Sequence, residues 1–113
     1  MASTADIRDE RVREALVGIE TLIDDGAYAS ACKNCAELYV EYLREHPDPP
    51  NVGNDPAQFG AAHGILWPRT GGVNVRRDES GVPSASYDKE RFSMSEALTY
   101  FEFVLEFLSK HQD

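Results

Sequence analysis

Apolar side chains recur every three or four positions in the first half of the chain, a spacing typical of amphipathic helices. Residues 6–24 carry one such stripe, and Gly26 is suited to the left-handed conformation that ends a helix. Residues 28–46 place apolar and charged side chains on opposite faces. The pattern predicts two helices, and because a short turn joins them, we expect an antiparallel pair.

The next segment changes from helical spacing to turn-forming residues. Residues 46–56 contain four prolines and a glycine, which predicts a loop. Asp55, Pro56 and Gln58 then match the residues that begin a capped helix. We therefore expect a short third helix over residues 56–66. Its glycines give it weak helix propensity, so its stability should depend on packing.

A capping box at Ser93 and Glu96 predicts a final helix over residues 93–110. The preceding insert, residues 67–92, has two short alternating segments around a turn-rich centre, which fits either a small β-hairpin or an ordered loop. The expected fold is mostly α: a single domain over residues 1–113, built as an up-down four-helix bundle with this insert between helices three and four.

The last predicted helix has a wider apolar arc than one side of a four-helix core needs. One stripe, assigned to the core, comprises Met94, Ala97, Leu98, Phe101, Leu105 and Leu108. A second stripe runs through Tyr100, Phe103 and Phe107. Two alternatives remain open for it. Either the insert covers these aromatic side chains, or they form the interface of a homodimer.

Charge and hydropathy narrow the classes of partner. The chain has 113 residues, and 42% of them are hydrophobic, which suffices for one core. Its formal charge of −9 opposes broad electrostatic binding to nucleic acid or anionic lipid. No apolar run is long enough to cross a bilayer, and the first residues lack the pattern of a signal peptide. We expect a cytoplasmic protein without membrane contact.

The two cysteines, Cys32 and Cys35, lie in the apolar arc of the second predicted helix. Two thiols do not supply the four ligands of a structural zinc site, so we interpret them as core residues. We expect no metal and no cofactor, because the chain has no glycine-rich phosphate loop and no metal-ligand spacing.

Candidate chemistry is concentrated in the middle of the chain. His63 is a side chain able to transfer protons near neutral pH. Arg69, Arg76 and Arg77 carry the positive charge that a phosphate requires, and Trp67 or Tyr87 is able to stack on a base. The alternative is a solvated loop whose arginines are balanced by neighbouring carboxylates.

Three segments resemble the HEPN superfamily (higher eukaryotes and prokaryotes nucleotide-binding domain), whose members are small helical bundles. The first is residues 24–43, with an Ala-Glu pair at Ala36 and Glu37. The second is His63-Gly64, similar to the His-Gly of abortive-infection members, and the third is the closing segment from Phe92 to Leu108. The resemblance covers most of the chain.

Many members of this superfamily are metal-independent ribonucleases that act as dimers and use an arginine and a histidine separated by four to six residues. The resemblance makes His63 the general acid or base, whereas the arginine position falls on Pro56, Ala57 or Gln58. Gln58 or Arg69 would then substitute at the phosphate. With Asn54, these groups are expected to converge in a groove, where a ribose 2′-OH attacks the phosphate.

Two classes of function follow from the sequence. The first is a HEPN-like ribonuclease or nucleotide-binding protein of the defence or toxin type, which would act as a homodimer and contact RNA or a nucleotide locally. The second is a non-catalytic helical module that binds a protein partner through the stripe at Tyr100, Phe103 and Phe107.

Overall fold

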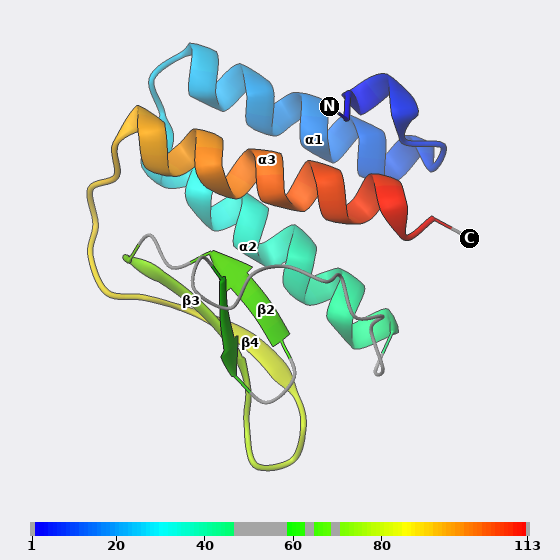
Figure 1. The fold of residues 1–113 in the computed structure, drawn as a ribbon. Helices are drawn as coiled ribbons and strands as arrows, with labels where there is room; N and C mark the ends of the chain where they lie inside the picture. Colours follow the sequence, from blue (N-terminus) through cyan, green and yellow to red (C-terminus); the bar gives the residue numbers. More distant parts are fainter. Residues whose placement is uncertain (1, 47–58, 63–64, 69–70, 113) are drawn as a thin grey trace.

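The computed structural model describes residues 2–46, 59–62, 65–68 and 71–112 (Figure 1). In chain order, its elements are a short 3₁₀ helix η1 (Thr4–Asp6), α1 (Glu10–Asp24), α2 (Tyr28–Glu45), β1 (Phe59–Ala62), β2 (Ile65–Pro68), β3 (Val73–Arg77), β4 (Pro83–Tyr87) and α3 (Met94–Lys110). These residues form an α+β fold of three α-helices and two antiparallel hairpins. The expected up-down four-helix bundle is therefore wrong.

The first two helices form in the predicted segments, but α1 begins at Glu10 rather than at residue 6, because Asp9 caps it. The Asp9 carboxylate caps α1 by accepting a hydrogen bond from the Val12 amide. At the other end Gly26 adopts a φ of 79°, and the amides of Gly26 and Ala27 donate to the carbonyls of Ile23 and Leu22. This pair of bonds is the Schellman arrangement, which ends a helix and reverses the chain. α1 and α2 pack together as the expected pair.

The predicted third helix is wrong, because residues 59–62 and 65–68 pair as strands β1 and β2. Phe59 lies opposite Pro68, and Ala62 lies opposite Ile65. In β2, Ile65 and Trp67 are 1% and 5% exposed and belong to the hydrophobic core. The segment has weak helix propensity, and burying these two side chains stabilises the strand instead. Local residue spacing does not reveal this stabilisation, because it comes from tertiary packing.

The insert contains a hairpin, which confirms one of the two alternatives left open. β3 and β4 pair with Val73 opposite Tyr87 and Arg77 opposite Pro83. Asp78 orders the connecting turn, since its Oδ1 accepts hydrogen bonds from the amides of Ser80 and Val82 at 2.8 and 2.9 Å. Val73 and Val75 face the core while Arg76 is exposed, the alternation expected of a strand with one buried face.

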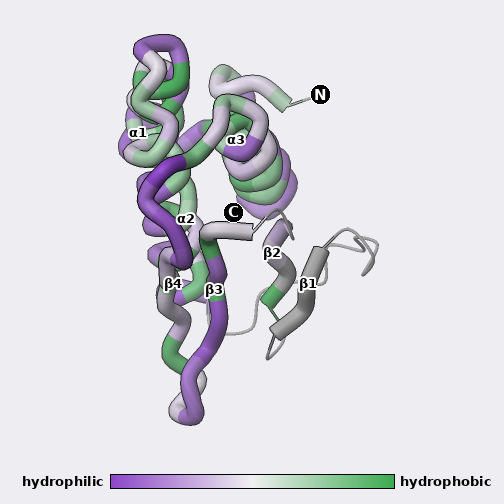
Figure 2. Tube along the Cα trace, turned by 90° about the vertical axis from the view of Figure 1, so that its left-hand side faces the viewer, coloured by the Kyte–Doolittle hydropathy of each residue, from purple (hydrophilic) through white to green (hydrophobic). Residues whose placement is uncertain are grey.

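One hydrophobic core joins the helices to the hairpins. The β3–β4 hairpin packs on α2, and β2 contacts both α3 and β3. α1 packs on α2 and α3, away from the hairpins, so the molecule has a helical part and a β part (Figures 1 and 2). α2 is central to this arrangement because it contacts both other helices and the β3–β4 hairpin.

A segment before α1, residues 2–9, ties the first helix to the end of the last. Ile7 is 2% exposed and belongs to the core. The Gln112 side chain accepts a hydrogen bond from the Arg8 amide at 2.7 Å and donates one to the Asp6 carbonyl at 2.8 Å. The Ala2 amide donates to Glu106 on α3 at 2.8 Å. We call residues 2–9 the N-terminal strap.

None of the described helices has both the length and the apolar character needed to span a membrane.

Candidate functional site

The residues predicted to carry catalysis lie outside the described parts of the chain. They are Asn54, Gln58, His63 and Arg69. The predicted convergence of these groups in a groove is therefore untested, and the ribonuclease hypothesis stays a prediction.

The two predicted phosphate-binding arginines are neighbours on β3 but face opposite sides of the strand. Arg76 is exposed, whereas Arg77 is half-buried and donates a hydrogen bond from Nη1 to the Gly81 carbonyl at 3.0 Å. Adjacent residues of a strand point to opposite faces. The pair does not form a single clamp around a phosphate.

The predicted interface residues are core residues of this chain. Tyr100, Phe103 and Phe107 are 0%, 8% and 5% exposed. The Trp67 ring stacks on Tyr100 at 5.1 Å with an interplanar angle of 13°, and it meets Phe103 edge-on at 5.6 Å. Tyr39 of α2 contacts both Phe103 and Phe107. We call these five rings the aromatic cluster; the part of the insert that bears Trp67 covers the stripe.

The same burial applies to other candidates for chemistry. Trp67 donates from Nε1 to the Val73 carbonyl at 3.1 Å, so neither its ring nor its N–H is free for a nucleotide base. Cys32 and Cys35 are buried free thiols, which confirms them as core residues. Burial raises the pKa of Cys32 to about 12 and raises that of Cys35 further, so both stay protonated and unreactive at neutral pH.

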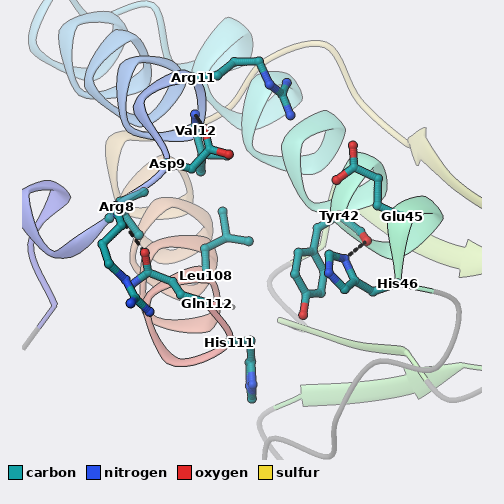
Figure 3. Close-up of a pocket in the computed structure, with 11 residues that line it drawn as sticks. Arg8, Asp9, Arg11, Val12, Tyr42, Glu45, His46, Leu108, His111 and Gln112 are labelled. Atoms are coloured by element: carbon teal, nitrogen blue, oxygen red, sulfur yellow. Dashed lines mark hydrogen bonds between the residues drawn. The ribbon is translucent and has the colours of Figure 1, made fainter.

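The described surface contains a pocket of about 250 Å³ where the ends of three helices meet (Figure 3). The start of α1 and the ends of α2 and α3 contribute its walls. We call it the helix-end pocket. It is lined by Ile7, Arg8, Asp9, Arg11, Val12, Tyr42, Glu45, His46, Leu108, His111 and Gln112.

Charges of both signs surround the helix-end pocket. Arg11 forms an ion pair with Glu41 at 2.6 Å, and this contact raises the pKa of its guanidinium. The Asp9 carboxylate already accepts the hydrogen bond of the Val12 amide, so an incoming anion does not find this amide open. Glu45 adds a further carboxylate to the lining. The rim is therefore mixed in charge rather than basic.

Aromatic groups form one wall of the pocket. The His46 imidazole stacks on the Tyr42 ring with centroids 4.1 Å apart and an angle of 14°, and its Nδ1 lies 3.0 Å from the Tyr42 carbonyl oxygen. His111 packs on Phe107 at 4.7 Å, and its buried Nε2 has no hydrogen-bond partner among the described residues. Burial, with a smaller effect from Lys110, lowers the pKa of His111. His111 is thus largely neutral at pH 7.

Sequence reasoning did not identify this pocket, because its residues come from three separate segments. His46 and His111 follow the last residues of α2 and α3, where a titratable side chain is common and has no distinctive motif. The available signal was topological: α1 is antiparallel to α2, so the start of the one lies beside the end of the other (Figure 1). The antiparallel pairing puts Arg8 and Arg11 near His46, but it does not determine that the end of α3 lies beside them.

Comparisons with known proteins give no family. The sequence matches no protein-family model, no curated protein and no solved structure. The described residues also contain no group of three or more histidine, cysteine, aspartate or glutamate side chains arranged to hold a metal ion.

Proposed function

We propose that the protein is a non-catalytic interaction module and that the helix-end pocket receives an apolar side chain of a partner protein. The observation that carries this proposal is the chemistry of the pocket: an apolar floor inside a rim of mixed charge. Ile7, Val12 and Leu108 supply the aliphatic surface. A buried apolar centre with a polar rim is the usual anatomy of a protein interface.

The size of the pocket supports a side chain as its occupant. Its volume of about 250 Å³ is slightly below the range of roughly 300–1,000 Å³ that holds small-molecule ligands. A single aromatic or long aliphatic side chain fits a space of this kind, and such anchors dominate the energy of many interfaces.

The polar rim supports a peptide over a phosphate. Asp9 and Glu45 would repel a phosphate, while one cationic group of the rim, Arg11, is already paired with Glu41. A peptide backbone offers both donors and acceptors, which suits a rim that carries guanidinium, carboxylate, amide and imidazole groups. The rim thus favours a peptide ligand that carries an apolar anchor.

Peptide selection with the purified protein tests the proposal. We expect selected peptides to share one apolar anchor and to bind the Val12→Arg variant at least about tenfold more weakly, because an interface anchor is worth on the order of 2 kcal/mol. Val17→Arg is the matched control, since Val17 lies on the same helix, is 46% exposed and does not line the pocket. Failure to select any peptide, or equal losses in the two variants, would contradict the proposal.

The competing ribonuclease hypothesis has its own test. RNA is incubated with the wild-type protein and with His63→Ala, both without metal ions, and the products are resolved by size. A non-catalytic module predicts no cleavage that depends on His63. Cleavage that disappears in His63→Ala would establish the ribonuclease and overturn the non-catalytic assignment.

A further inference from the structure

A second concave surface lies between α1 and α3, on the side of α3 that the hairpins do not cover. It has a volume of about 390 Å³ and includes residues of both helices and of the N-terminal strap. We call it the α1–α3 groove. It is lined by Ala2, Ser3, Thr4, Glu20, Leu98, Phe101, Glu102, Leu105 and Glu106.

The floor of the groove is apolar and continues into exposed apolar surface. Leu98, Phe101 and Leu105 lie on one face of α3, because their spacing follows the helical period. Phe101 and Leu105 are almost buried, whereas Leu98 is 37% exposed. Met94, one turn before Leu98, is 52% exposed. The apolar face of α3 therefore emerges from the core into solvent at this groove.

One exposed apolar side chain, Leu98, lines the groove, and two others lie elsewhere on its two helices. Four large apolar side chains of the described residues are strongly exposed, and three belong to the two helices of the groove: Val17, Met94 and Leu98. The fourth, Val82, lies at the turn of the β3–β4 hairpin. The exposed Leu98 side chain beside the nearly buried Phe101 and Leu105 gives the groove an apolar surface of the kind that partners cover.

All ionisable side chains that line the groove are acidic. Glu106 already accepts a hydrogen bond from the Ala2 amide, and its other oxygen lies 3.7 Å from Lys110. Glu20 and Glu102 form no hydrogen bond or ion pair within the described parts of the chain. The groove thus presents two unpaired carboxylates beside an apolar floor.

We infer that the α1–α3 groove binds a basic amphipathic helix of a partner protein. Leu98 and Leu105 are seven residues apart, about 10 Å along α3, which matches two apolar anchors one heptad apart on a docked helix. Lysines or arginines beside those anchors would meet Glu20 and Glu102. This site is separate from the helix-end pocket, and the inference does not depend on the function proposed for that pocket.

The charge of the groove disfavours two other occupants. A second copy of this chain related by two-fold symmetry would bring the same three carboxylates of each copy together. The surface of an anionic membrane would be repelled by the same groups and by the net charge of −9. A cationic partner would instead be attracted both by these carboxylates and by the negative net charge.

Fluorescence anisotropy with a labelled synthetic helix tests the inference. The probe has about 18 residues, long enough to populate a helix, with leucines at helical spacing and lysines elsewhere. We expect the full-length protein to bind it, but not a version with glutamates in place of lysines or one with scrambled leucines. Absence of binding to the lysine probe, or equal binding to the scrambled probe, overturns the inference.

Matched variants locate the binding surface. The double substitution Glu20→Gln and Glu102→Gln should weaken binding about fivefold, as expected for two exposed ion pairs. The charge-matched control, Glu79→Gln with Glu90→Gln, should change it less than about twofold, because both residues are exposed outside the groove. Equal losses in the two pairs would show non-specific attraction and overturn the inference.

An apolar variant and a measurement of mass complete the test. Leu98→Ala should weaken binding about tenfold, while Val82→Ala, an exposed apolar residue on the hairpin turn, should not alter it. Light scattering is then applied to the protein alone. A dimer that Leu98→Ala dissociates would make this face an interface between copies and overturn the inference.

Discussion

The two apolar faces of α3 differ in what covers them: the insert buries one, and part of the other is exposed to solvent. The face with Tyr100, Phe103 and Phe107, for which the sequence left cover by the insert and a homodimer interface both open, is buried in the aromatic cluster. The face that was assigned to the core includes Met94 and Leu98, which are exposed. An apolar stripe reveals that something covers it, but only the tertiary structure shows whether the cover belongs to the same chain.

The largest effect is expected from removing the cover of the aromatic face. Trp67→Ala should lower the free energy of unfolding by about 3–5 kcal/mol, because a buried indole and its contacts with Tyr100 and Phe103 are lost. Leu98→Ala on the open face should cost less than about 1 kcal/mol. Denaturant unfolding measures both. Similar costs for the two variants would contradict the contrast between the faces.

A substitution at Gly72, just before β3, tests how closely the chain packs on the hairpin side of the molecule. Gly72 has a φ of 90°, and an added Cβ would lie 2.7 Å from both Lys89 Cε and Phe92 Cε1. Gly72→Ala should therefore combine backbone strain with a clash and cost about 2–4 kcal/mol.

Its neighbour provides the control for this effect. Gly71 has a φ of 82° but open space around the Cβ position, so Gly71→Ala should cost only the strain of about 1–2 kcal/mol. Thermal unfolding measures the stability of both variants, and the difference between them gives the cost of the clash. A Gly72→Ala variant as stable as Gly71→Ala would show that Phe92 and Lys89 do not pack closely there.

The smallest effect concerns the entry to α3 and depends on pH. A hydrogen bond from Lys89, with further bonds at Ser93, lowers the pKa of Glu96 in the folded protein. A lowered carboxyl pKa stabilises the fold above the unfolded value of roughly 4.3, and this contribution is lost as the pH falls through the folded pKa. Glu96→Gln should thus lower Tm by about 3 °C at pH 7 and by less at pH 3.

Glu102, on the solvent-exposed side of α3, provides the control for this pH dependence. Glu102 is exposed and has no partner within the described residues, so Glu102→Gln should leave Tm nearly unchanged at both values. Calorimetry at the two pH values checks the contrast. A Tm deficit of Glu96→Gln that is as large at pH 3 as at pH 7 would exclude ionisation as its cause.

The sequence predicts the elements whose signals are local. The stripe and the glycine cap of α1, the arc of α2 with its buried cysteines, and the capping box of α3 at Ser93 are all present in the structure. The β3–β4 hairpin was one of two open alternatives. Each of these features depends on residues within a few positions of one another, where spacing and hydrogen-bonding preference decide the conformation.

The features that the sequence did not predict depend on distant residues. β2 is a strand because Ile65 and Trp67 reach buried positions in the core that α2 and α3 help to form, and four-residue strands carry little periodicity of their own. The helix-end pocket joins Arg8, Tyr42 and His111, which are far apart in sequence. Such a site forms where the ends of different helices come together. The hydrophobic spacing along a single helix does not specify which helix ends are neighbours.

The N-terminal strap forms part of the wall of both proposed binding sites. Its first residues, Ala2 to Thr4, line the α1–α3 groove, and its last residues, Ile7 to Asp9, line the helix-end pocket. Gln112 holds the middle of the strap through the Arg8 amide and the Asp6 carbonyl. A ligand that shifts the strap at one surface changes the affinity of the other, and by thermodynamic linkage the factor is the same in both directions. Because these eight residues border both concave surfaces, ligands at the two sites would affect each other's binding wherever one of them displaces the strap.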